Sequence, residues 1–302
     1  VGASPYATPG YSPQDAQDLY RVMRAIKKQQ DNLEVTDWHL TGYSLGGLHA
    51  AFVSDLDERE QAFNFKRVLL LNPPVNLYTS VSNLNRLAQV QVVNAAETRT
   101  FYQLMLDKLS RYFNSKGRFD FNEAMLFDFQ NSAQKLSDND LAMLIGSAFR
   151  FIAADINFTS DLINRRGIIT PPQQRINDGT SLTPFFKRAL LCDFECYIQQ
   201  QLLPFWRVHV QKQQPNTAAD NPIADLDALT QASSLYALTD YLSTSSKIGV
   251  MHNADDIILG QGDLAFLKQH MPERLTVYPY GGHLGNLNYR DNAADILEFF
   301  HD

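Results

Sequence analysis

The amino-acid sequence predicts an α/β protein built on a mostly parallel sheet. Short apolar segments alternate with helical ones in two stretches, 1–74 and 247–302, and this alternation is typical of parallel sheets with crossover helices. The stretch between them, 75–246, has helical character and no convincing strand. We therefore expect one sheet domain in two parts, interrupted by a large helical insertion at 75–246.

The first part is expected to begin with a helix over 13–29, where apolar residues recur at helical spacing after a Ser-Pro start. A short strand is expected over 36–41, followed after a glycine-rich turn by a helix over 48–54. The run 67–71 is apolar and ends at an Asn-Pro-Pro sequence, as expected for a parallel strand covered on both faces. Strand, helix and strand in this order predict a βαβ unit.

The middle of the chain is dense in aromatic residues. Proline-containing segments at 170–172, 203–204 and 221–222 are expected to separate its helices. These aromatic residues are expected mainly to form the core of the insertion. Where the insertion covers a reactive group, its phenylalanines and leucines would also line part of the substrate pocket and favour apolar groups.

The second part resumes the sheet pattern. We expect a strand over 247–252, a helix over 262–270, a strand over 275–278 and a last amphipathic helix over 292–300. Each strand is followed by a helix, which again favours parallel pairing.

Charge and motif content exclude several classes of function. Lysine and arginine number 26 against 33 acidic residues, so the formal charge of −7 disfavours nucleic acid and anionic membranes as partners. No apolar run approaches the roughly 20 residues that span a bilayer, so no transmembrane segment is expected. The common phosphate, zinc and calcium motifs are missing from the sequence, and we expect neither a cofactor nor a metal.

The sequence has two cysteines, Cys192 and Cys196. One pair at this spacing fits neither a disulfide-dense scaffold nor a four-ligand zinc site, so we expect two ordinary thiols. The alternative is a disulfide, which would indicate an oxidising compartment such as the periplasm or the extracellular space. The compartment is otherwise left open.

A possible nucleophile lies in the segment Gly42-Tyr-Ser-Leu-Gly46, which has the pattern G-x-S-x-G between a predicted strand and a predicted helix. The small residues permit a sharp turn that would expose the Ser44 hydroxyl at the carboxyl end of the sheet. The backbone N–H of Leu45, at the start of the helix, would be free to face an oxyanion.

A serine hydroxyl needs a base, and the base needs a group that orients it. His283 follows the last predicted strand in a glycine-containing loop and is the candidate base. Asp255 and Asp256 follow the strand before it, where the acid of a Ser, Asp, His order is expected. Asp256 is the better candidate, because the turn residue Asn253 precedes it by three positions and the apolar pair Ile258-Leu259 follows it. Asp255 remains an alternative.

These segments resemble the α/β-hydrolase superfamily, with Gly42–Gly46 at the position of the nucleophile elbow. The resemblance implies an eight-stranded, mostly parallel sheet with an inserted cap, and a triad of Ser44, Asp256 and His283. It implies cofactor-independent hydrolysis of a carboxylic ester, with a small-molecule ester or lipid as the substrate. The alternative is a hydrolase-like binding or scaffold protein whose cap binds a lipid or a protein.

The chain departs from the family's pattern before the elbow. Four strands precede the elbow strand in that fold, whereas only about 35 residues precede it here. We therefore expect the sheet to lack its N-terminal strands and the second oxyanion N–H. An upstream segment or a separate chain would complete the sheet, unless the protein is a hydrolase with a reduced sheet.

Overall fold

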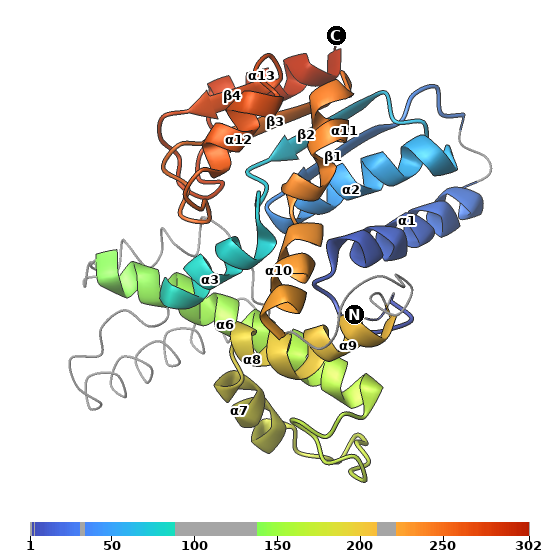
Figure 1. Ribbon diagram of the computed structural model, residues 1–302, viewed down its shortest axis with the longest axis vertical. Coiled ribbons are helices and arrows are strands. Elements are labelled where there is room, and N and C mark those ends of the chain that lie inside the picture. The colour runs from blue at the N-terminus through green and yellow to red at the C-terminus, as the bar shows by residue number, and fades with distance from the viewer. Residues whose placement is uncertain (1, 3, 31–33, 88–137, 210–221, 302) are drawn as a thin grey trace. The chain divides into compact units, whose positions relative to one another are not determined.

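The computed structural model describes residues 2, 4–30, 34–87, 138–209 and 222–301 (Figure 1). The chain divides into two compact units. One comprises Val1–Asn83 with Ala153–Asp302, and the other comprises Leu84–Ile152. The sheet and the candidate site residues belong to the first unit.

The protein has an α/β fold with a parallel sheet of four strands in the order β1, β2, β3, β4. The strands are β1 (His39–Tyr43), β2 (Arg67–Leu71), β3 (Ile248–Asn253) and β4 (Leu275–Tyr278). The predicted bounds of β2 and β4 are correct. β1 begins later than expected, because its ladder with β2 starts only where the Lys66 N–H donates to the Trp38 carbonyl.

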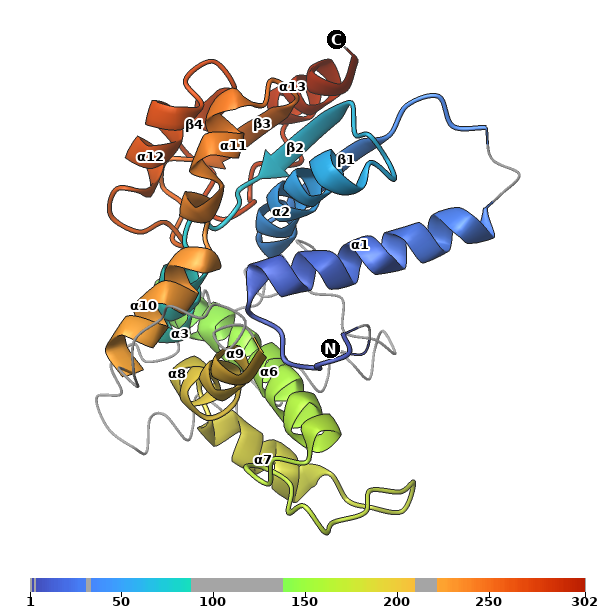
Figure 2. The same ribbon diagram turned by 45° about the vertical axis from the view of Figure 1, so that its right-hand side comes forward.

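Alternate residues of β2 face opposite sides of the sheet, which explains why the strand is continuously apolar. Val68 and Leu70 belong to the main core, together with residues of α1 (Ser12–Gln29) and α2 (Leu45–Glu60). Leu69 and Leu71 pack with residues of α13 (Arg290–His301) in a separate cluster. The helices α2 and α13 therefore cover opposite faces of β2 (Figure 2).

The helical character predicted for the middle of the chain is confirmed for the part that the structure describes. There the chain forms helices and, instead of a strand, one isolated bridge between Asn76 and Ser234. Residues 88–137 and 210–221 lie outside the described residues, and the boundaries 75–246 of the expected insertion stay a prediction. The elements are α3 (Leu77–Leu87), α6 (Asp138–Asn164), α7 (Thr183–Leu191), α8 (Phe194–Tyr197), η1 (Ile198–Leu202), α9 (Leu203–His209), α10 (Pro222–Ala232), η3 (Leu235–Leu238) and α11 (Thr239–Thr244).

The second part of the chain adds α12 (Asp263–His270) between β3 and β4, as expected, and ends in α13. None of the helices in the described ranges combines the length and the apolar content needed to cross a membrane.

The prolines of the middle act in different ways. Residues 170–172 lie in the loop between α6 and α7, and α10 begins at Pro222, as predicted. At Pro204 the helical path continues, changing from the π-helix η1 to α9. The Leu203 N–H bonds five residues back to the Ile198 carbonyl, and this wider turn makes room for the proline ring.

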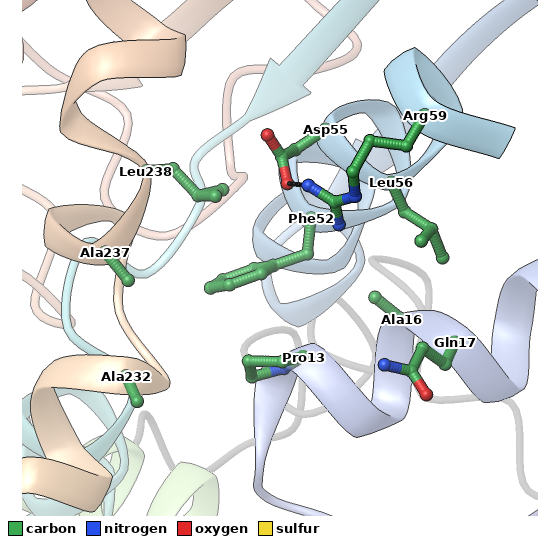
Figure 3. Close-up of a pocket in the computed structure, with 10 residues that line it drawn as sticks. All are labelled: Pro13, Ala16, Gln17, Phe52, Asp55, Leu56, Arg59, Ala232, Ala237 and Leu238. Carbon is green, nitrogen blue, oxygen red and sulfur yellow. Dashed lines mark hydrogen bonds and ion pairs between the residues drawn. The ribbon is translucent and has the colours of Figure 1, made fainter. Parts of the chain in front are cut away.

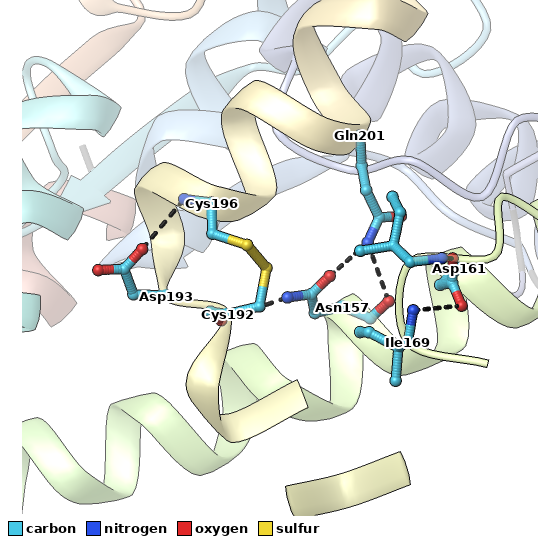
Figure 4. The surroundings of a disulfide bond; sticks show 8 residues. Asn157, Asp161, Ile169, Cys192, Asp193, Cys196 and Gln201 are labelled. Atoms are coloured by element: carbon cyan, nitrogen blue, oxygen red, sulfur yellow. Dashed lines mark hydrogen bonds between the residues drawn. A yellow bond between two sulfur atoms is a disulfide. The ribbon is translucent and has the colours of Figure 1, made fainter. Parts of the chain in front are cut away.

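The expectation of two free thiols is wrong, because Cys192 and Cys196 form a disulfide (Figure 4). The corner between α7 and α8 brings their Cα atoms to 5.2 Å, which is within the usual range for a disulfide. Asp193 shapes this corner by accepting the Cys196 N–H at the start of α8. The side chain of Asn157 donates to the Cys192 carbonyl and ties the corner to α6.

Candidate active site

Ser44 occupies a strained turn between β1 and α2. Its φ of 51° and ψ of −129° lie in a region that residues with a side chain rarely adopt. The Ser44 N–H donates to the Leu71 carbonyl over 2.9 Å, and the Ser44 carbonyl accepts from Gly47 over 2.8 Å. Gly42 makes the turn possible, because a Cβ there would lie 2.1 Å from the Gly46 carbonyl oxygen. The turn therefore requires a glycine at position 42.

Leu45 is the first residue of α2. The first N–H groups of a helix have no intrahelical partner, and the N-terminus carries partial positive charge. The N–H of Leu45 therefore lies next to the Ser44 hydroxyl in an environment that favours a negatively charged oxygen.

The structure brings Ser44, His283 and Asp256 together. The Ser44 Oγ lies 2.8 Å from Nε2 of His283, although 239 residues separate them in the chain. Nδ1 of the same ring lies 3.0 and 3.1 Å from the two carboxylate oxygens of Asp256. A neutral ring with its proton on Nδ1 donates to the carboxylate and accepts from the hydroxyl.

The loop that carries His283 depends on two glycines with positive φ, Gly281 at 150° and Gly282 at 54°. The side chain of Asn253 donates to the Gly282 carbonyl over 2.8 Å. A Cβ at Gly281 would lie 2.6 Å from that same side chain. The close packing of the loop against Asn253, the last residue of β3, fixes the place from which His283 projects.

The two neighbouring aspartates make different contacts. The side chain of Asp256 is fully buried and accepts the Ile258 N–H over 3.1 Å in addition to its contact with His283. The exposed Asp255 accepts the N–H groups of Gly281 and Gly282, over 3.2 and 2.8 Å. Of the two candidates, Asp256 is therefore the one bonded to the imidazole, and Asp255 bonds to the backbone of the loop.

Sequence reasoning overlooked Asn72, which it treated only as the end of a strand. Its Nδ2 donates to Oδ2 of Asp256 over 2.8 Å, and both side chains are buried. The contact joins residues 184 positions apart, so the local sequence gives no sign of it.

His252 lies near Asp256 and is completely buried. Its Nε2 donates to the Pro73 carbonyl over 3.1 Å, and its Nδ1 accepts the Asn253 N–H over 3.0 Å. Burial lowers the pKa of His252, although the nearby Asp256 acts in the opposite direction. Nδ1 lies 3.8 Å from the Asp256 carboxylate, too far for a hydrogen bond, so His252 joins the ends of two strands.

Ser44 lines a cavity of about 640 Å³ between α1, β1 and α2. Because β1 is an edge strand, this cavity extends along a side of β1 that pairs with no other described strand. Most of the lining is apolar, and Leu45 contributes to it next to the serine. The lining residues are Leu19, Met23, Leu40, Thr41, Gly42, Tyr43, Ser44, Leu45, Gly46, His49, Ala50, Val53 and Leu71.

His49, which also lines this cavity, lies close to Asp15 of α1, and both side chains are half-buried. Its Nε2 lies 3.8 Å from Oδ2 of Asp15. Burial lowers the pKa of His49 to about 4. Burial raises the pKa of Asp15 to about 7, although the carboxylate accepts the Gly10 N–H over 2.7 Å.

A second, smaller cavity of about 250 Å³ lies between α1, α2 and the α10–η3 segment (Figure 3). Its lining is mainly apolar, with an ion pair between Asp55 and Arg59 at 3.0 Å. No serine, cysteine or histidine is among the residues that line this second cavity. The described residues also bring together no group of three possible metal ligands.

Comparisons with known proteins add little to this geometry. No protein-family model matches the chain, and no curated protein matches it. Among solved structures, a thioesterase domain from the curacin biosynthetic pathway is similar with a TM-score of 0.34 and 13% sequence identity. The alignment covers 98% of this chain and 75% of that chain. Similarity at this level does not bear on activity.

Proposed function

We propose that this protein is a serine hydrolase that cleaves carboxylic esters. Ser44 acts as the nucleophile, His283 as the base and Asp256 as the group that orients the base. The continuous hydrogen-bonded path from the Ser44 Oγ through the imidazole to the Asp256 carboxylate carries the proposal. The same order of hydroxyl, imidazole and carboxylate is the known arrangement for activating a serine.

The reaction follows from these contacts. As the Ser44 Oγ attacks the ester carbonyl, its proton moves to Nε2 of His283, and the Asp256 carboxylate stabilises the resulting imidazolium. The carbonyl oxygen becomes an oxyanion next to the Leu45 N–H. When the tetrahedral intermediate collapses, the imidazolium gives its proton to the departing alcohol. Water then attacks the acyl-enzyme with the same base, releasing the carboxylic acid and restoring Ser44.

The lining of the cavity supports an apolar acyl group as the preferred substrate portion. Leu19, Met23, Leu40 and Val53 line the same cavity as the serine. Each methylene that moves from water into such a site stabilises the bound state by about 0.8 kcal/mol. Esters of longer apolar acids should therefore react faster than acetates until the chain fills the cavity.

A fluorophosphonate probe tests the nucleophile directly, because it phosphonylates a serine only where a base activates it. We expect the wild-type protein to be labelled at Ser44 and the Ser44→Ala variant to remain unlabelled. Ser82→Ala is the matched control, since Ser82 is an exposed residue of α3, and it should label like the wild type. A folded wild-type protein that never reacts would contradict the proposal and favour a non-catalytic binding protein.

A further inference from the structure

Asn72 is placed to act on the candidate acid and has no other assigned part in the site. It follows β2 directly and is only 3% exposed. Its amide nitrogen lies 2.8 Å from Oδ2 of Asp256. A hydrogen bond of this kind, from a buried amide to a buried carboxylate, is among the stronger ones in proteins.

The donors around Asp256 divide between its two oxygens. The Ile258 N–H bonds to Oδ1, Asn72 bonds to Oδ2, and the His283 Nδ1 is within reach of both. Without the amide of Asn72, Oδ2 would rely on the imidazole alone. When a fully buried carboxylate oxygen loses a donor, the carboxylate either rotates towards another donor or leaves that oxygen without a hydrogen bond, which is unfavourable. Either outcome disturbs the alignment of the carboxylate with His283.

The backbone holds the Asn72 amide firmly in place. The Asn72 N–H donates to the Met251 carbonyl over 2.8 Å, so the residue is tied to β3, the strand that leads to Asp256. The next residue, Pro73, accepts a hydrogen bond from the buried His252 on the same strand. Two links between the ends of β2 and β3 therefore fix the donor relative to its acceptor.

We propose that Asn72 is a positioning residue that sets the orientation of the Asp256 carboxylate towards His283. Through that carboxylate it keeps the imidazole proton on Nδ1 and leaves Nε2 free to accept the proton of Ser44. The inference rests on the proposed function of Ser44, but it also makes a statement about hydrogen bonding that holds without turnover.

Two properties of Asn72 can explain why an asparagine stands at this position: its backbone conformation and its side-chain hydrogen bond to Asp256. Asn72 has a φ of 44°, and asparagine is one of the few residues with a side chain that adopt such values readily. Asn72→Gly keeps the backbone conformation and removes only the amide. We expect phosphonylation of Ser44 to slow by about tenfold to a hundredfold, the range for a lost hydrogen bond to a charged group.

Asn76→Gly is the matched control. Asn76 lies in the same loop after β2 and accepts the N–H groups of Tyr78 and Thr79 at the start of α3. In the described part of the chain, its side chain bonds to these two N–H groups and not to Asp256. This variant should lose stability and still react with the probe at the wild-type rate.

Asn72→Asp provides a charge readout that a purely structural role would not produce. The new side chain has nearly the same shape and also tolerates positive φ. It would place a second carboxylate against Oδ2 of Asp256, and two adjacent carboxylates tend to share one proton. The pH profile for phosphonylation should therefore gain an ionisation that the wild type lacks, whereas Asn76→Gly should leave the profile unchanged.

Nuclear magnetic resonance decides the inference even if the protein has no hydrolase activity. A His283 Nδ1 proton held by a carboxylate gives a low-field resonance, which should be present in the wild type and be lost or displaced in Asn72→Gly. If the resonance and the phosphonylation rate both stay unchanged, Asn72 does not position Asp256. If the wild type fails to label but the resonance responds to Asn72→Gly, the positioning holds and the proposed function fails.

Discussion

Asp255 and Asp256 are adjacent in the chain but bind different parts of the same loop. Asp256 bonds to the imidazole of His283, whereas Asp255 bonds to the N–H groups of Gly281 and Gly282. One carboxylate thus contacts the side chain of the candidate base, and the other contacts the backbone that presents it. The two contacts predict different consequences of mutation.

We expect Asp256→Asn to lower kcat by about 10⁴-fold, because an amide in place of the acid favours the wrong imidazole tautomer. Asp255→Asn keeps an oxygen that can accept the loop N–H groups, and its exposed position limits the effect to less than about tenfold. Ester turnover by the two variants and the wild type provides the measurement. A larger loss in Asp255→Asn than in Asp256→Asn would reverse the assignment of the two aspartates.

The width of the cavity should control the choice of acyl chain. Leu19 and Met23 of α1 line the cavity at Ser44, whereas Val22, 37% exposed on the same helix, does not. Leu19→Trp should fill part of the cavity and lower kcat/KM for p-nitrophenyl octanoate more than for the butyrate. Val22→Trp is the control for adding an indole to this helix, and its ratio of octanoate to butyrate turnover should match the wild type.

The disulfide should contribute modestly to stability and little to activity. It closes a loop with a sequence separation of four, and the chain-entropy relation gives about 2 kcal/mol for so short a loop. Urea unfolding with and without a reducing agent should differ by about this amount in the wild type. A Cys192→Ser, Cys196→Ser double variant should show no response to the reducing agent, and ester turnover should be similar in all three samples.

Regular elements could be predicted from the sequence where local pattern and burial agree. The apolar run of β2 is buried on both faces, so its bounds were evident. The start of β1 was not, because only pairing with the Trp38 carbonyl shows where the ladder begins. In the candidate site, the motifs predicted Ser44 and His283, and the structure places the Ser44 Oγ 2.8 Å from the His283 Nε2.

Features that depend on distant contacts could not be predicted in this way. The disulfide follows from the corner that Asp193 shapes between two helices, and spacing alone does not reveal that corner. From the local sequence, Asn72 is predicted only to end a strand. Its hydrogen bond to Asp256 becomes evident only from the pairing of β2 with β3. The pairing of Asp15 with His49 likewise requires the packing of α1 against α2.

The Asp15 and His49 pair makes opposite contributions to the pH dependence of stability. The folded-state pKa of Asp15 is raised from 3.8 to about 7, so between these values the folded state holds a proton that the unfolded state has lost. Its contribution therefore falls as pH rises, by up to about 4 kcal/mol. The pKa of His49 is lowered from 6.5 to about 4, so its contribution rises with pH over that range, by about 3 kcal/mol.

Because the two ranges overlap between pH 4 and 6.5, the contributions largely cancel in the wild type. Asp15→Asn keeps an acceptor for the Gly10 N–H and should expose the histidine's contribution, so that its free energy of unfolding rises with pH relative to the wild type. His49→Gln should show the reverse trend, because only the carboxyl of Asp15 then contributes. Urea unfolding of the three proteins at pH 4.5, 5.5 and 6.5 measures both slopes. Parallel curves for all three would mean that neither group has the shifted pKa that its burial implies.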